Sequence, residues 1–253
     1  MNIGIPQINK PNKAFKKIVE QAEPVEAGMY KAVFNRFVTL GFQESDFEEG
    51  KIQFITVFGF ELVEDMMGNK VPNHWKVFDD GSREEGAKTL TREYPLNDQL
   101  HHKSNGFAIA KALDPQVPTI RKGKENEHEY IVDFNWDAQL GKTVLLQVNK
   151  KKAKAGHFYN QIQSVMPLGA PLDAQLPTVF FNLYNPDMQE VWEKEVYGWE
   201  KKKVSERRQI PGEPPVVYGD APAQEEQPQE QPKEEAPQAI VDEEADADDD
   251  RPF

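Results

Sequence analysis

Hydrophobic and polar residues alternate with a period of two along the first part of the chain. From Tyr30 to Leu40 the even positions are mostly apolar, while Lys31 and Asn35 take the opposite side. The segment Ile52–Leu62 repeats this alternation. A period of two, rich in aromatic and β-branched residues, is typical of half-buried β-strands. Both segments are therefore predicted strands, and Arg36, at an apolar position of the first, predicts a β-bulge.

Shorter apolar segments follow, separated by turn residues. The further predicted strands are Trp75–Phe78, Lys88–Tyr94, Thr143–Val148 and Phe158–Val165. A short helix is expected at Gly106–Leu113, because Ser104-Asn105 supplies an N-cap and Pro115 a stop. Five or six strands and one helix suit a small closed barrel better than a sandwich, which usually has more strands. The pattern is compatible with an OB-fold, a five-stranded and partly open barrel.

The two ends of the chain differ from the middle. Residues 1–25 hold three prolines and scattered lysines, and they predict a basic arm with a short helix near Ala14–Gln21. Asn185 and Pro186 predict the start of a helix that continues to Lys203 and packs on the barrel. From there to the end, proline, glutamine and acidic residues dominate, and this composition cannot bury enough surface to offset chain entropy. The predicted domains are an N-terminal arm (1–25), a barrel with a C-terminal helix (26–205), and a disordered linker and tip (206–253).

The net charge of −13 is concentrated in the tail. Residues 220–253 carry 13 acidic and two basic side chains, which leaves residues 1–219 nearly neutral. A uniformly acidic surface that would repel nucleic acid is therefore excluded. The absence of cysteine excludes disulfides, thiolate metal sites and cysteine nucleophiles. Because no apolar run approaches the roughly 18 residues of a membrane helix, and no signal peptide is recognisable, we expect a soluble cytoplasmic protein without a membrane partner.

A basic hairpin is the first candidate for chemistry. The window Ala138–Leu172 contains no acidic residue. It carries five lysines, followed at once by two aromatic residues, and these are Lys142, Lys150, Lys151, Lys152, Lys154, Phe158 and Tyr159. Lysines can follow a phosphate backbone, and exposed rings can stack on unpaired bases. The alternative is a solvated hairpin that its lysines keep soluble.

Aromatic residues of the earlier strands are mostly expected in the core. Phe37 is the better candidate for an exposed stacking platform, because Lys31 and Asn35 mark its face as polar. Trp75 beside Lys76 is a similar candidate. Together with Tyr94, these residues complete the expected contact set for single-stranded DNA: Lys31, Phe37, Trp75, Lys76, Tyr94, Lys142, Lys150, Lys151, Lys152, Lys154, Phe158 and Tyr159.

Catalytic and metal-binding patterns are sparse. The histidines do not have the spacing of metal ligands on a helix, and no thiolate can complete a zinc site. The acidic residues Asp79, Asp80, Glu84 and Glu85 lie in a charge-rich stretch that reads as a solvated loop rather than a nuclease site. No Gly-rich phosphate loop and no nucleophile elbow is found. We therefore expect a protein that is not an enzyme, with no catalytic residue, no metal and no cofactor.

The last six residues form a distinctive tip, Asp248-Asp249-Asp250-Arg251-Pro252-Phe253. Acidic residues before a terminal Pro-Phe resemble the C-terminal tip of single-stranded DNA-binding proteins of the bacterial and phage type. The segment Leu140-Gly141-Lys142, the strand after it, the basic loop and Phe158-Tyr159-Asn160 resemble the last hairpin of phage-encoded members.

This resemblance implies an OB-fold that coats single-stranded DNA during replication, recombination and repair in a bacterial host cell. It also implies that Pro252 and Phe253 anchor replication or recombination proteins, with Asp248, Asp249 and Asp250 as electrostatic support. Two features depart from the family: Arg251 replaces an aliphatic residue, and the loop Gly41–Gly50 is acidic where DNA would approach. The alternatives are an acidic protein-interaction adaptor or DNA mimic, and a metal-dependent nuclease.

Overall fold

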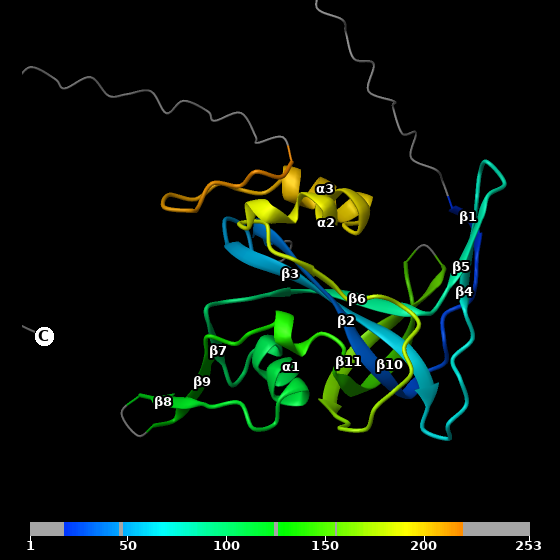
Figure 1. Ribbon diagram of the computed structural model, residues 1–253, viewed down its shortest axis with the longest axis horizontal. Coiled ribbons are helices and arrows are strands. Elements are labelled where there is room, and N and C mark those ends of the chain that lie inside the picture. The colour runs from blue at the N-terminus through cyan, green and yellow to red at the C-terminus, as the bar shows by residue number, and fades with distance from the viewer. Residues whose placement is uncertain (1–17, 46–47, 124–125, 155, 220–253) are drawn as a thin grey trace, which may run out of the picture. The chain divides into compact units, whose positions relative to one another are not determined.

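The computed structural model describes residues 18–45, 48–123, 126–154 and 156–219 (Figure 1). The chain divides into residues 1–222 and residues 223–253, and every described residue belongs to the first unit. The described part is mainly β and contains three open sheets, which confirms the predicted class. The first 17 residues of the predicted arm and the predicted partner-binding tip lie outside the described residues.

The central sheet has the order β11-β10-β2-β3-β6, with all neighbours antiparallel. Its strands are β2 (Gly28–Glu44), β3 (Ile52–Asp65), β6 (Thr89–Pro95), β10 (Thr143–Lys152) and β11 (Phe158–Pro167). A sixth strand, β12 (Val179–Phe181), pairs with β2 in parallel. Strands at these five long segments are therefore confirmed. The predicted bounds of β2 and β3 were too short, because apolar alternation marks only the part of each strand that faces a core.

Two small sheets flank the central one. The first joins β1 (Ile18–Gln21), β4 (His74–Phe78) and β5 (Arg83–Gly86). The second joins β7 (Gln99–His101), β9 (His128–Val132) and β8 (Ile120–Lys122). The helix expected near Ala14–Gln21 is wrong for its described part, because Ile18–Gln21 pairs with β4 as a strand.

One helix, α1 (Asn105–Leu113), precedes a 3-10 turn, η1 (Asp137–Gln139), on the path from β6 to β10. The Ser104 hydroxyl caps α1 by accepting a hydrogen bond from the Phe107 N–H at 3.2 Å, as the sequence predicts. The described residues form two hydrophobic cores. The apolar face of α1, which includes Ile109 and Leu113, packs in the first core with aromatic and aliphatic residues of the central sheet.

The two edge strands of the central sheet approach each other. The Arg92 guanidinium on β6 donates a hydrogen bond to the carbonyl oxygen of Ile162 on β11. No backbone ladder joins these strands within the described residues, so the sheet remains open. Side chains of β2, β3, β10 and β11 fill the space that the curved sheet surrounds.

A β-bulge in β2 is confirmed beside Arg36. The register of β2 against β3 shifts between Phe34 and Arg36, so one extra residue is inserted. Arg36 then lies opposite Gly59, where a Cβ atom would come within 2.6 Å of the Arg36 Cβ. Only glycine allows this close approach of the two strands.

A second layer covers the other face of the β2–β3 ribbon. Val38, Leu40 and Val57 of the ribbon pack there against Phe181, Leu183, Val196, Val204 and Tyr218. The predicted helix from Pro186 to Lys203 is instead three pieces: η2 (Pro186–Met188), α2 (Gln189–Lys194) and α3 (Gly198–Ser205). The layer continues beyond the predicted boundary at residue 206, since Arg207 and Tyr218 are buried.

A buried ion pair explains why the helix is interrupted. Glu200 accepts a hydrogen bond from the Tyr197 N–H at 2.8 Å and so caps α3. The same carboxylate forms an ion pair with the Arg36 guanidinium and accepts a hydrogen bond from its Nε, 3.0 Å from Oε1. Arg36 also donates to the carbonyl oxygen of Glu195, in the break between α2 and α3. The chain therefore turns at residues 195–197 to place both acceptors around one guanidinium.

We expect Glu200→Gln to lower the free energy of unfolding by about 3–5 kcal/mol, because it leaves the Arg36 charge buried without a counter-charge. Glu206→Gln is the matched control, since Glu206 is exposed just after the same helix and should change stability by about 0.5 kcal/mol or less. Denaturant unfolding measures both variants. Equal effects would show that the ion pair does not hold the second layer.

Candidate nucleic-acid interface

The end of the β10–β11 hairpin presents lysines and aromatic rings on two faces. Lys152 lies opposite Phe158 and Val148 lies opposite Ile162. Because side chains alternate along a strand, Lys150, Lys152 and Phe158 continue the face that Val148 and Ile162 turn to the core. The Lys150 and Lys152 Nζ atoms lie 5.4 and 5.7 Å from the centre of the Phe158 ring. Phe158 is still 49% exposed, so its ring is available to a ligand.

The opposite face of the hairpin carries the second ring. Lys151 lies opposite Tyr159, and Asn149 lies opposite Gln161. Tyr159 is 41% exposed. Phe158 and Tyr159 are thus accessible from different sides, and a nucleic-acid strand that stacks on both has to cross the hairpin end.

Lys150 differs from its neighbours because it is neutralised by the segment before β2. Its Nζ lies 2.7 Å from Glu26 Oε1 and 3.9 Å from Glu23 Oε2. The hydrogen bond to Glu26 raises the pKa of Lys150. Among the described residues, Lys151, Lys152 and Lys154 form no ion pair. The acid-free window of the sequence could not reveal the pairing of Lys150, since both carboxylates come from a distant part of the chain.

Two predicted lysines lie elsewhere. Lys142 immediately precedes β10, at the end opposite Lys152, and ten residues of strand correspond to about 34 Å. Lys31 lies near the start of β2 and forms an ion pair with Glu64, with Nζ 2.5 Å from Oε1. The structure therefore does not bring either residue together with the hairpin cluster.

The predictions that Phe37 and Tyr94 are exposed stacking platforms are wrong. Phe37 is 3% exposed and stacks between Trp136 and Phe180, with ring centres 5.3 and 5.5 Å away. Tyr94 is 5% exposed and packs edge-on against Phe58. The bulge explains why Phe37 is buried. One inserted residue reverses the alternation of side chains after Phe34, so the Phe37 side chain points toward the first core.

Trp75 and Lys76 lie on β4, and Trp75 lines a cavity of about 520 Å³. The segment Ala22–Glu26 forms another wall of this cavity, and its Glu26 reaches Lys150 of the hairpin. The Arg83 guanidinium lies 4.9 Å from the Trp75 ring centre. Trp75 is thus near the hairpin but separated from it by an acidic segment, while Lys76 faces a different groove.

His74 and Lys88 line the same cavity side by side. The Lys88 Nζ atom lies 3.4 Å from His74 Nδ1. Burial, followed by the charges of Lys88 and Lys76, lowers the pKa of His74 to about 4. Burial and the Lys76 charge lower the pKa of Lys88 as well. His74 is therefore neutral at pH 7, so it does not repel the Lys88 ammonium beside it.

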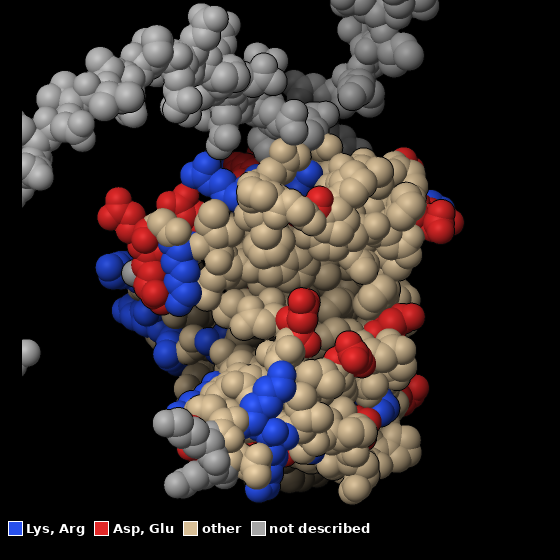
Figure 2. All heavy atoms as spheres, turned by 90° about the vertical axis from the view of Figure 1, so that its left-hand side faces the viewer, with Lys and Arg blue, Asp and Glu red and all other residues tan. Residues whose placement is uncertain are grey.

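Another face of the molecule is poor in charge. Figure 2 shows that Lys, Arg, Asp and Glu are sparse over much of the side that lies on the left of Figure 1. A groove of about 830 Å³ lies where β2 ends and β3 begins, and its lining includes Phe42, Phe54, Tyr184 and Pro211. Without a row of cations, this groove is less suited to a phosphate backbone than the hairpin is.

The structure also assembles a group that sequence spacing missed. His101, His102 and His128 each place a ring nitrogen within 4.8 Å of the others, although His128 is distant in sequence. Helical spacing could not reveal this group, because strand pairing of β7 with β9 creates it.

Comparisons with models of protein families, with curated proteins and with solved structures find no match for this chain. Within the described ranges, no helix is long and apolar enough to cross a membrane.

We expect folding stability to fall as the pH decreases from about 6.5 to about 4, in part because of His74. An unfolded histidine titrates near 6.5, while the pKa of folded His74 is about 4. Between these values the unfolded state binds more protons, so acid favours unfolding. The melting temperature of the wild type should therefore drop more between pH 7 and pH 5 than that of His74→Gln. His157→Gln, which removes an exposed histidine, should follow the wild type; a parallel drop in all three proteins would contradict the assignment.

Proposed function

We propose that the protein binds single-stranded DNA without sequence preference, through the end of the β10–β11 hairpin, and that its barrel is an OB-fold. One observation carries this proposal: the exposed rings of Phe158 and Tyr159 lie next to Lys151, Lys152 and Lys154, which have no ion-pair partner among the described residues. Stacking and backbone neutralisation together are the usual means of binding unpaired nucleic acid.

The strand order supports the OB-fold part of the proposal. Strands β2, β3, β6, β10 and β11 are five in number, with α1 between the third and the fourth. The order β11-β10-β2-β3-β6 places the third and fifth of these strands, β6 and β11, at the two edges of the sheet, where Arg92 and Ile162 link them. In an OB-fold, the loop between the fourth and fifth strands is one of two that bind oligonucleotides. Here that loop is the lysine-rich hairpin end.

The second layer limits where DNA can run. Residues 179–218 cover the outer face of β2 and β3, the first two strands of the proposed OB-fold. They therefore cover the β3 part of the face of the second and third strands, which binds oligonucleotides in OB-folds. Phe37 and Tyr94 are buried, so bases cannot stack on their rings. We therefore place the DNA across the hairpin end, with bases on Phe158 and Tyr159 and phosphates on Lys151, Lys152 and Lys154. Each stacked base contributes about 1–3 kcal/mol, and any base has a face to stack.

The C-terminal tip completes the proposed function. Asp248, Asp249, Asp250, Pro252 and Phe253 would recruit replication or recombination proteins, with the terminal ring in an apolar pocket and the carboxylates near basic side chains. The linker predicted from the sequence would let the same acidic residues compete with DNA for the hairpin lysines.

We expect the triple variant Lys151→Ala, Lys152→Ala, Lys154→Ala to bind oligo-dT at least about tenfold more weakly at low salt. Neutralising about three phosphates should give the wild type a slope of log affinity against log salt near −2, at roughly −0.7 per phosphate, and the variant a slope near zero. Fluorescence titration at several salt concentrations measures both quantities.

The matched control removes three lysines elsewhere, Lys142→Ala, Lys194→Ala and Lys202→Ala. It loses the same charge and should retain the wild-type slope. If both triple variants lose affinity equally, net charge and not the hairpin controls binding. If the wild type does not bind oligo-dT at all, the acidic adaptor remains as the alternative, and degradation of the oligonucleotide with magnesium would indicate a nuclease.

We expect Glu26→Gln to tighten binding of oligo-dT about two- to fivefold at low salt, because it frees the Lys150 ammonium from an exposed ion pair. One more neutralised phosphate should make the salt slope steeper by about 0.7. Glu190→Gln is the control, since it breaks a similar exposed ion pair with Lys194 on α2. An affinity gain that is the same for both variants would show a general charge effect.

A further inference from the structure

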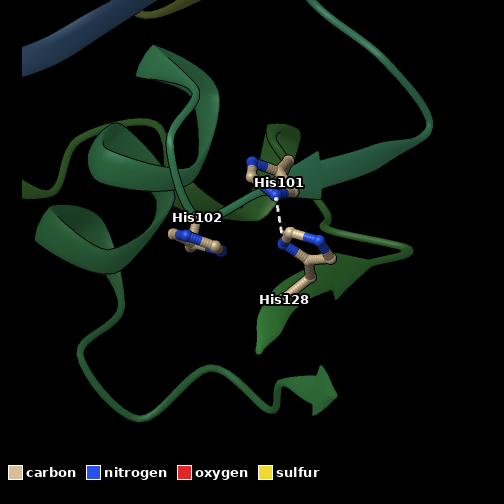
Figure 3. A group of neighbouring side chains, drawn as sticks. All are labelled: His101, His102 and His128. Atoms are coloured by element: carbon tan, nitrogen blue, oxygen red, sulfur yellow. Dashed lines mark hydrogen bonds between the residues drawn. The ribbon is translucent and has the colours of Figure 1, made fainter. Parts of the chain in front are cut away.

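Three histidines meet where β7 and β9 lie side by side (Figure 3). His101 is the last residue of β7, His102 follows in the turn before α1, and His128 begins β9. The pairing of His101 with Tyr130 and the hydrogen bond from the His102 N–H to the Glu129 carbonyl oxygen, at 2.8 Å, hold the two segments in register. The three rings are partly buried and turn toward one another.

The ring nitrogens have the separations that a small tetrahedral ion requires. His101 Nε2 lies 3.3 Å from His128 Nδ1. Zinc–nitrogen bonds of 2.0–2.1 Å at a tetrahedral angle place two ligand nitrogens about 3.3–3.4 Å apart. One nitrogen of each ring lies within 4.8 Å of the others, so closing the triangle needs a movement of about 1.5 Å or less.

The surroundings of His128 fit a ligand role. Its Nε2 lies 3.5 Å from Glu127 Oε1, while its Nδ1 faces the other two rings. A carboxylate that accepts the second ring N–H of a histidine is a common partner of zinc ligands, because it orients the ring and raises its basicity. The Lys103 N–H donates to His101 Nδ1, so a neutral His101 carries its proton on Nε2 and donates it to His128 Nδ1. The lone pair of His128 Nδ1 therefore points toward His101.

We propose that His101, His102 and His128 bind one zinc ion, with water in the fourth position. Imidazole is a preferred ligand of zinc, and three histidines with an open position form a known zinc arrangement. The ion would join the end of β7 and the turn before α1 to the start of β9. Its role is therefore to fix this small sheet and the N-terminus of α1 on the barrel, independently of DNA binding.

Zinc uptake has to move ring protons within this cluster. The Lys103 N–H donates to His101 Nδ1, and the Glu129 N–H donates to His102 Nδ1, each at 3.2 Å. These two bonds leave the ring proton on Nε2 when both rings are neutral. A metal at Nε2 of either ring requires the ring proton to move to Nδ1, and the two long hydrogen bonds are then given up.

Calorimetric titration of the untagged, full-length protein with Zn²⁺ at pH 7.5 tests the proposal. We expect one high-affinity site per chain. His128→Ala and His101→Ala should each weaken it by about 100-fold or more, since even loss of a supporting partner costs 10- to 100-fold. Zinc at 100 times its dissociation constant should raise the melting temperature of the wild type by about 5–10 °C and leave that of the variants unchanged.

The control is His157→Ala, which removes a histidine from the hairpin and should keep the stoichiometry and affinity of the wild type. The variant lacking all three cluster histidines gives the background of zinc held by carboxylates. Equal binding by the wild type and this variant would overturn the proposal. If a variant does not fold, the visible absorption of Co²⁺ on the wild type decides: an intense band of a tetrahedral site that zinc displaces supports the site, and a weak octahedral spectrum refutes it.

Discussion

One inserted residue in β2 determines how the rest of the chain packs. The bulge beside Arg36 reverses the side-chain alternation, so that Phe34 and Phe37 face one core while Val38 and Leu40 face another. Without this reversal Phe37 would lie on the face that the C-terminal segment covers, and Val38 and Leu40 would face the first core. The bulge also aims Arg36 at Glu200, whose carboxylate caps α3. The bulge in β2, the buried Arg36–Glu200 ion pair and the start of α3 therefore depend on one another.

The second layer gives the proposed DNA site its position. It occupies the outer face of the β2–β3 ribbon and leaves free the end of the β10–β11 hairpin, where exposed rings lie beside lysines that form no ion pair within the described part of the chain. The acidic segment before β2 adds a local control, because Glu26 holds Lys150 while the next lysines remain available. Cationic density at the hairpin is thus lower than the sequence implies, and a binding strand would compete with a carboxylate of the same chain.

The hairpin and the histidine cluster depend on sequence in different ways. Lysines and rings at the hairpin are neighbours along the chain, so their proximity was predictable from the spacing of Lys152 and Phe158 around one turn. The histidines come together only because β7 pairs with β9. Their positions in the sequence do not have the spacing of a metal-binding motif. Local patterns reveal sites that one turn can build, while sites across strands need the register of the sheet.

Residue patterns along the chain are enough to predict the mainly β class, the positions of the main strands, the capped helix α1 and the aromatic, lysine-rich hairpin. These features depend on alternation, caps and turns, which act over a few residues. Only the tertiary structure decided that Phe37 and Tyr94 are buried, that Lys150 is paired, that the C-terminal helix is broken and that three histidines converge. Each of these depends on contacts between distant segments, and a single bulge or ion pair sets such contacts without leaving a periodic signal in the chain.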